Sequence, residues 1–188
     1  MQLVVGLGNP GARYKYTRHN IGFLLIDQLV PNAVDWHVAD DLCAHIATVE
    51  RADQEVLLVK PQTYMNRSGE TLRAMCSQWD FSPEQVLVLL DDFELDFGRL
   101  RLRRGGSDGG HNGLASVLET LQTIEVPRLR LGIGRPPENE AVIDFVLSTF
   151  VAEDNLEGLI KRGIQAVDLY LAEGVESAMN SINGIPAL

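Results

Sequence analysis

The sequence predicts an α/β fold: a single domain, residues 1–188, in which helices flank a mostly parallel, mixed central sheet to give three layers. Short apolar runs of strand length alternate with segments whose apolar residues recur every three or four positions, as in amphipathic helices. The chain contains no internal repeat, low-complexity tract or interdomain linker. A length of 188 residues lets such a domain bury a core without disulfides or a metal.

The first half of the chain alternates predicted strands and helices. Each strand is a short apolar run, and turn-forming Gly, Asn, Pro or Ser residues separate the runs from the helical patterns. Pro61 interrupts the third run, because proline cannot donate to a strand ladder. In chain order, the predicted elements are a strand at 3–7, a helix through 21–29, strands at about 44–50 and 55–60, and a helix through 72–79.

The second half begins with a wholly apolar run, 86–90, which is typical of a strand covered on both faces and is the predicted centre of the sheet. Two later segments, 99–103 and 128–131, alternate Arg with Leu, so each strand there would have one basic and one apolar face. A glycine-rich stretch at 105–113 lies between them and leads into a helix. The amphipathic pattern at 156–171 predicts a long helix near the end of the chain.

Composition and charge limit the classes of function. A formal charge of −10 argues against a protein that coats nucleic acid indiscriminately, because binding to phosphates requires Lys and Arg, so any such contact must be local. Cys43 and Cys76 form no Cys-x-x-Cys or Cys/His pattern, and we expect ordinary thiols. No apolar run is long enough to span a bilayer, and no secretory signal follows Met1. We therefore expect a cytoplasmic protein without membrane contact.

Polar side chains follow three of the predicted strands. Asn9 and His19 come after the first strand, Tyr64-Met65-Asn66 after the third, and Asp91-Asp92 after the fourth. In open α/β sheets the ligand crevice lies beyond the carboxyl ends of the strands, so we expect these residues at one site. A histidine as general base toward water, a carboxylate that fixes its tautomer, and amides that hold carbonyl groups suffice for hydrolysis.

Each of these residues also has a plain structural interpretation. His19 precedes a helix and would be a cap or a surface residue, the two aspartates would cap a turn, and Asn9 would give a loop its freedom. Their shared position at strand ends favours function. Other hydrolytic chemistries lack their patterns, because no His-x-x-x-His pair or Gly-x-Ser-x-Gly elbow occurs. We predict no metal and no cofactor.

Three further segments have two interpretations each. Gly-Gly-His-Asn-Gly at 109–113 would either cradle an anion or connect a strand to a helix, and it lacks the lysine and hydroxyl residue of a phosphate loop. The four arginines within 99–104 form either a solvated strand face or a phosphate-binding strip. The segment 135–142 is either a lid over the crevice or a surface connection.

Several long motifs run in a fixed order along nearly the whole chain: Val5 to Gly11, Tyr14, Thr17 to Phe23, Lys60-Pro61, Thr63 to Asn66, Ser68-Gly69, Asp91-Asp92, Gly98, Gly106-Ser107, Gly109 to Leu114, Arg130, Gly132 to Pro136 and Phe145 to Leu147. This set resembles the signature of bacterial peptidyl-tRNA hydrolases. The resemblance implies a peptidyl-tRNA hydrolase-like fold. It also implies hydrolysis of the ester that joins a peptide to the ribose at the 3′ end of tRNA, so that tRNA is recycled after premature release from the ribosome.

The resemblance also implies roles for individual residues. His19 would be the general base that activates water, and Asp91 its partner, with direct attack by water on the ester. The implied substrate-binding residues are Asn9, Tyr14, Tyr64, Met65, Asn66, His111 and Asn112. The implied tRNA-binding residues are Arg101, Arg103 and Arg130. The expected partner is peptidyl-tRNA, through its acceptor end and its peptide, bound by a monomer without a metal.

Two features depart from the usual pattern of this family. Phe93 to Phe97 replaces a more usual run of leucines, aspartate and prolines after Asp91, and Asp108 places an acid in a loop expected near RNA. Two alternatives to the esterase are a noncatalytic RNA-binding relative and a peptidase or amidase of similar fold. The intact His19, Asp91 and three asparagines favour catalysis over the first of these.

Overall fold

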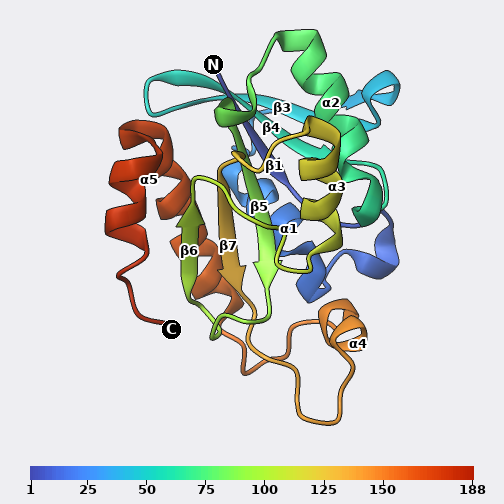
Figure 1. Ribbon diagram of the computed structural model, residues 1–188, viewed down its shortest axis with the longest axis vertical. Helices are drawn as coiled ribbons and strands as arrows, with labels where there is room; N and C mark the ends of the chain where they lie inside the picture. The colour runs from blue at the N-terminus through green and yellow to red at the C-terminus, as the bar shows by residue number, and fades with distance from the viewer.

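Seven strands form one mixed sheet in the computed structural model, which describes residues 1–188 (Figure 1). Their order across the sheet is β2-β3-β4-β1-β5-β7-β6. The strands are β1 (Gln2–Gly6), β2 (His37–Ala39), β3 (Ala44–Arg51), β4 (Gln54–Pro61), β5 (Val86–Asp92), β6 (Leu100–Arg103) and β7 (Arg128–Gly132). The helices are α1 (Ile21–Leu29), α2 (Ser68–Trp79), α3 (Asn112–Leu121), α4 (Val142–Leu147) and α5 (Leu156–Ile182).

The mostly parallel, mixed α/β sheet predicted from the sequence is confirmed. Strands β4, β1, β5 and β7 are parallel neighbours, while the outer pairs β2–β3, β3–β4 and β6–β7 are antiparallel. The predicted central strand is wrong by one position, because the middle strand is β1 and β5 lies beside it. A wholly apolar run identifies a strand of the sheet interior, but tertiary packing decides which interior strand lies in the middle. Both β1 and β5 are buried on both faces, so their sequences do not distinguish them.

Alternating side chains divide the interior into two cores. Val4 of β1 and Leu87 of β5 face the layer of α1 and α5, whereas Leu3 and Val88 face the layer of α2 and α3. Because successive side chains of a strand point to opposite faces, each interior strand contributes to both cores. In Figure 1 the long helix α5 covers one side of the sheet and α2 and α3 cover the other.

Several elements differ from the predicted ones. The short strand β2 and the short helix α4 were not expected, since neither has a repeating apolar pattern long enough to predict it and both depend on tertiary contacts. Helix α3 begins at Asn112, within the glycine-rich stretch that was expected to precede it. Helix α5 extends to Ile182 across a kink at Gly174, whose φ of 78° favours glycine. None of the helices combines the length and apolar character needed to cross a membrane.

The carboxyl ends of the parallel strands meet at one edge of the sheet, as the sequence predicted. Strands β5 and β7 point toward this edge at the bottom of Figure 1, where α4 lies below the sheet. β4, β1 and β5 are hydrogen-bonded neighbours, so the segments that follow them emerge side by side. This edge therefore collects the polar residues that were expected at one site.

Candidate active site

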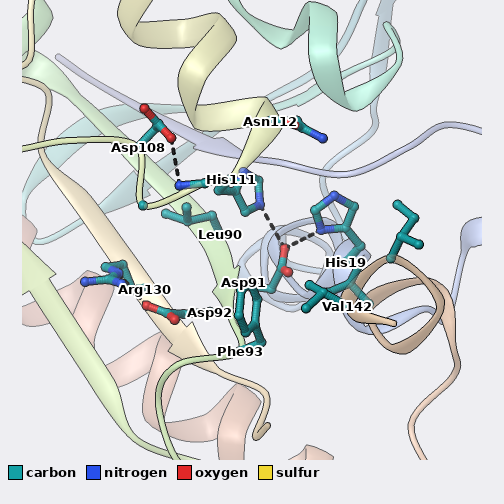
Figure 2. A pocket seen from close by; sticks show the side chains of 14 residues that line it. His19, Leu90, Asp91, Asp92, Phe93, Asp108, His111, Asn112, Arg130 and Val142 are labelled. Carbon is teal, nitrogen blue, oxygen red and sulfur yellow. Dashed lines mark hydrogen bonds and ion pairs between the residues drawn. The ribbon is translucent and has the colours of Figure 1, made fainter. Parts of the chain in front are cut away.

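A carboxylate shared by two histidines lies at this edge (Figure 2). Asp91, near the end of β5, accepts at one oxygen, Oδ1, from both rings: His19 Nδ1 lies 2.8 Å away and His111 Nε2 lies 3.0 Å away. His19 belongs to the 3₁₀ turn η2 (Arg18–Asn20), which leads into α1, and His111 precedes α3. Asp91 is 3% exposed and His19 is 9% exposed, so the contacts are largely shielded from water.

The second histidine has a defined tautomer. His111 is the N-cap of α3, and its Nδ1 accepts the backbone N–H of Leu114 at 3.1 Å. Because an accepting ring nitrogen carries no hydrogen, the hydrogen of His111 is on Nε2 and is donated to Asp91. A His19 that likewise donates from Nδ1 keeps a lone pair on Nε2, which Figure 2 places on the side of Asn112.

These contacts hold Asp91 in its ionised form. Burial alone would raise the pKa of this carboxyl, but the electrostatic attraction and hydrogen bonds of His111 and His19 outweigh burial, and the pKa of Asp91 lies well below its usual range. The three side chains are close enough to bind a metal ion, with their facing atoms within 4.8 Å. A metal there would have to replace both histidine hydrogens that Asp91 accepts.

A cavity of about 240 Å³ opens in front of His19 and Asp91. One wall is the end of the glycine-rich segment with His111 and Asn112, and the opposite wall is α4, through Val142, Ile143 and Val146. Asp92 and Arg130 line a third side. The prediction for the segment 135–142 is thus partly wrong. Its last residue, Val142, does not end a loop but is the first residue of α4, and it lines the cavity.

Asp92 has a different partner from Asp91. Successive residues of β5 point to opposite faces, and Asp92 forms a close ion pair with Arg130, while its Oδ1 accepts the N–H of Glu94 at 2.9 Å. The ion pair is close without the alignment of a hydrogen bond. The plain interpretation of a turn cap therefore applies to Asp92, whereas Asp91 contacts both histidines.

Asn9 is held from two sides. Its side-chain oxygen accepts the N–H of Met65 at 2.9 Å, and its backbone pairs reciprocally with the side chain of Asn20, with both contacts at 2.9 Å. Asn9 does not line the cavity but borders a separate depression of about 280 Å³ together with Asn20. Sequence reasoning missed Asn20, although it directly follows His19 in the same motif.

The other expected substrate-binding residues lie in different surroundings. Met65 is buried beneath the first turn of α3, where a Cβ on Gly113 would come within 2.4 Å of its sulfur. Tyr64 is 60% exposed and Asn66 is also exposed, beside the site but outside the cavity lining. Tyr14 is half-buried, and the guanidinium of Arg13 covers its ring at 4.5 Å.

The expected tRNA-binding arginines share one face of the β6–β7 pair. Arg101 lies directly opposite Arg130 across the two strands, and Arg103 lies opposite Arg128. The leucines between them belong to the core beside α5, so the arginines face the other side, next to the glycine-rich segment. The charge of Arg103, together with burial, Arg130 and Arg99, lowers the pKa of Arg101, as expected for crowded cations.

Two nearby arginines are engaged within the protein. Arg128 is 2% exposed and donates to the carbonyl oxygens of Val126, Gly106, Ser107 and Ile124. Arg104 lies 3.6 Å from carboxylates of Glu125 and Glu176. The half-exposed Arg101 and Arg103, with Arg130 at the edge of the cavity, form what we call the arginine face.

Known proteins resemble this chain along nearly its whole length. The model of the family described as peptidyl-tRNA hydrolase matches residues 3–187. The peptidyl-tRNA hydrolase of Moorella thermoacetica is 45% identical over 193 residues, which cover 96% of this chain and 97% of that protein. That of Synechococcus sp. is 43% identical over 190 residues, which cover 97% of this chain and 83% of that protein.

A solved structure has the same fold. The crystal structure of the peptidyl-tRNA hydrolase from Acinetobacter baumannii superposes with a TM-score of 0.90 at 34% identity, over 98% of this chain and 95% of that chain. The sheet order and helical layers described above are therefore those of a known fold. Together with the match over residues 3–187, this similarity shows that the chain belongs to the peptidyl-tRNA hydrolase family.

Proposed function

We propose that this protein hydrolyses the ester bond between peptide and tRNA, with His19 as the general base and Asp91 as its partner. The observation that carries the assignment is the 2.8 Å contact between His19 Nδ1 and Asp91 Oδ1 beside the cavity. A carboxylate that accepts from Nδ1 fixes the tautomer in which Nε2 is free to take a proton, and it stabilises the charged ring that results.

The proposed reaction is direct attack by water. His19 Nε2 takes a proton as the water oxygen bonds to the ester carbonyl carbon, and the carbonyl oxygen becomes negatively charged. When this intermediate collapses, the bond from carbon to the ribose oxygen breaks, and the imidazolium returns its proton to that oxygen. The products are a free peptide and a tRNA with an intact 3′ end.

Amide groups around the cavity would position the ester and stabilise the developing charge. Asn112 stands on the wall beside His19, at the N-terminus of α3, where the helix dipole favours negative charge. The side chain of Asn9 is oriented by its contact with Met65 N–H, which leaves its NH₂ group available to a peptide carbonyl. Tyr14, Tyr64 and Asn66 are proposed to contact the substrate farther from the ester.

The arginine face is the proposed binding surface for tRNA phosphates. Arg130 connects this face to the cavity, so a bound acceptor end would lead from Arg101 and Arg103 toward His19. Most of the remaining surface would repel RNA, because the chain has 26 acidic and 16 basic residues. This contrast would orient the substrate before it enters the cavity.

The proposed reaction requires water, the substrate and one copy of the chain as a single domain, without a metal. Peptidyl-tRNA forms where translation takes place, so the proposed site of action is the cytoplasm. His111 is proposed to hold Asp91 in place by its second hydrogen bond rather than to exchange protons, since its Nδ1 is occupied by Leu114 N–H.

The test compares the purified protein with His19→Ala and with His37→Ala, a matched variant of an exposed histidine on β2. Each is incubated with a peptidyl-tRNA, and released peptide is measured. We expect His19→Ala to lose about 10²–10⁴-fold in kcat, as for removal of a general base, and His37→Ala to match the wild type. Equal release by the wild type and His19→Ala would refute the assigned role.

Two other results would support the alternatives. A wild type that binds tRNA but releases no peptide would indicate a noncatalytic RNA-binding protein. Cleavage of the corresponding free peptide at a rate similar to that of the ester-linked substrate would indicate a peptidase or amidase. The present proposal expects cleavage of the ester alone, because an ester has a better leaving group than an amide.

A further inference from the structure

The residue before His19 is a buried arginine that does not touch the cavity. Arg18 is 7% exposed, and its guanidinium lies between two aromatic rings, 4.8 Å from the ring centre of Phe145 and 5.0 Å from that of Phe150. Its NH1 group lies 2.8 Å from Asp154 Oδ2, close but poorly aligned for a hydrogen bond. All three partners belong to α4 or to the segment that follows it.

The backbone is joined in the same place. The N–H of Arg18 donates to the carbonyl of Ser148 at 2.9 Å, and Thr17 forms an antiparallel bridge with Thr149. Residues 145–154 are therefore held against Thr17 and Arg18, at the start of η2, by two backbone contacts and by the Arg18 side chain. The same helix presents Val142, Ile143 and Val146 to the cavity.

We propose that Arg18 is a positioning residue that sets the distance between the α4 wall and His19. A shift of α4 away from the cavity would pull Phe145 from the guanidinium and separate the ion pair, leaving a buried charge without its partners. Such a charge is strongly unfavourable, so the wall keeps its place. One turn of three residues would then position two sides of the site: His19 contacts Asp91, and Arg18 holds the wall opposite His111.

The expected effect on KM rests on the proposed function, whereas the contacts between Arg18 and the α4 wall do not. A wall that is preformed binds substrate without first being ordered, so loosening it should raise KM and leave kcat nearly unchanged, because His19 and Asp91 remain in contact. Hydrogen exchange of the free protein reports directly on whether the wall has loosened.

The experiment compares Arg18→Met, Arg18→Lys and Asp154→Asn with the wild type, and uses Arg162→Met as the matched control. Arg162 is another partly buried arginine, and it donates to the carbonyls of Gly98 and Pro186, away from the cavity. We expect amide exchange in residues 143–149 to accelerate at least about tenfold in Arg18→Met, while β5 is unchanged. KM for a peptidyl-tRNA should rise about tenfold with kcat within about threefold.

Arg18→Lys should raise KM less than Arg18→Met does, because lysine keeps the charge but not the planar stacking. If Arg18→Met does not fold, Asp154→Asn decides, since it removes only the ion pair and should show the same two effects at smaller size. Unchanged exchange in 143–149, or an equal change in Arg162→Met, would overturn the proposal. Absence of activity in the wild type would instead refute the proposed function, with the exchange result still standing.

Discussion

The cluster of Asp91, His19 and His111, here called the corner, lies beside the arginine face, but the polar groups of the two regions are arranged in opposite ways. At the corner, one buried carboxylate accepts from two rings, and each ring is fixed further by the backbone or by the turn that carries it. On the arginine face, cations stand opposite or beside one another across two strands, and Asp92 is the carboxylate paired with one of them.

The difference separates the requirements of chemistry from those of binding. A reacting group needs a fixed position, which buried and fully satisfied contacts provide. A surface for phosphates needs charge that the protein leaves unsatisfied, and like charges on facing strand positions weaken the sheet locally. On the proposed function, the arginine face sacrifices some stability for tRNA binding.

The largest expected effect comes from removing the charge at the corner. Asp91→Asn keeps the size of the side chain but no longer stabilises a charged His19, and its NH₂ group competes for the ring nitrogens. We expect kcat to fall by about 10²–10⁴-fold, while the affinity for tRNA ligands changes little. Single-turnover rates measure this directly. A variant with near wild-type kcat would show that Asp91 and its two histidines are not the chemical centre.

A smaller effect is expected from His111, where two substitutions separate catalysis from folding. His111→Ala removes both the donor to Asp91 and the N-cap of α3, whereas His111→Asn keeps a good N-cap. We expect both to lower kcat about 10-fold to 100-fold, and only the alanine variant to lose about 1 kcal/mol of unfolding free energy. Kinetics and denaturant unfolding give the two quantities. Equal stabilities would mean that the cap contributes nothing.

The smallest effect per substitution is expected on the arginine face. Arg101→Gln and Arg103→Gln should each weaken tRNA binding and reduce the slope of log K against log salt by about one unit, with kcat unchanged. Arg104→Gln is the matched control, because this arginine faces Glu125 and Glu176 and should leave the slope unchanged. A slope altered equally by all three would mean that general charge, rather than this face, attracts the RNA.

Much of the fold and the meeting of the polar strand ends followed from the sequence. The apolar runs predicted the interior strands, and parallel neighbours place their carboxyl ends together, so Asn9, His19 and Asp91 were expected at one edge. The alternation of Arg and Leu likewise predicted a basic face on β6 and β7.

What could not be predicted depends on contacts between distant segments. The separate partners of Asp91 and Asp92 follow from the pleat of β5, but the partners themselves come from η2, α3 and β7. The alternation of Arg and Leu predicted that Arg128 and Arg130 would lie on the same basic face. Packing instead buries Arg128 and leaves Arg130 at the cavity. The wall formed by α4 has no sequence pattern of its own and is held by Arg18.

The buried Arg128 has a consequence for the glycine-rich segment beside the cavity. Glycines lose more conformational entropy on ordering than other residues, so a free segment of this composition would oppose substrate binding by the entropy lost when it becomes fixed. The guanidinium of Arg128 donates to four backbone carbonyls, two of which belong to this segment. These hydrogen bonds already restrict the segment in the folded protein. The entropy is lost during folding, and the acceptor end of a tRNA would meet a segment that is already ordered.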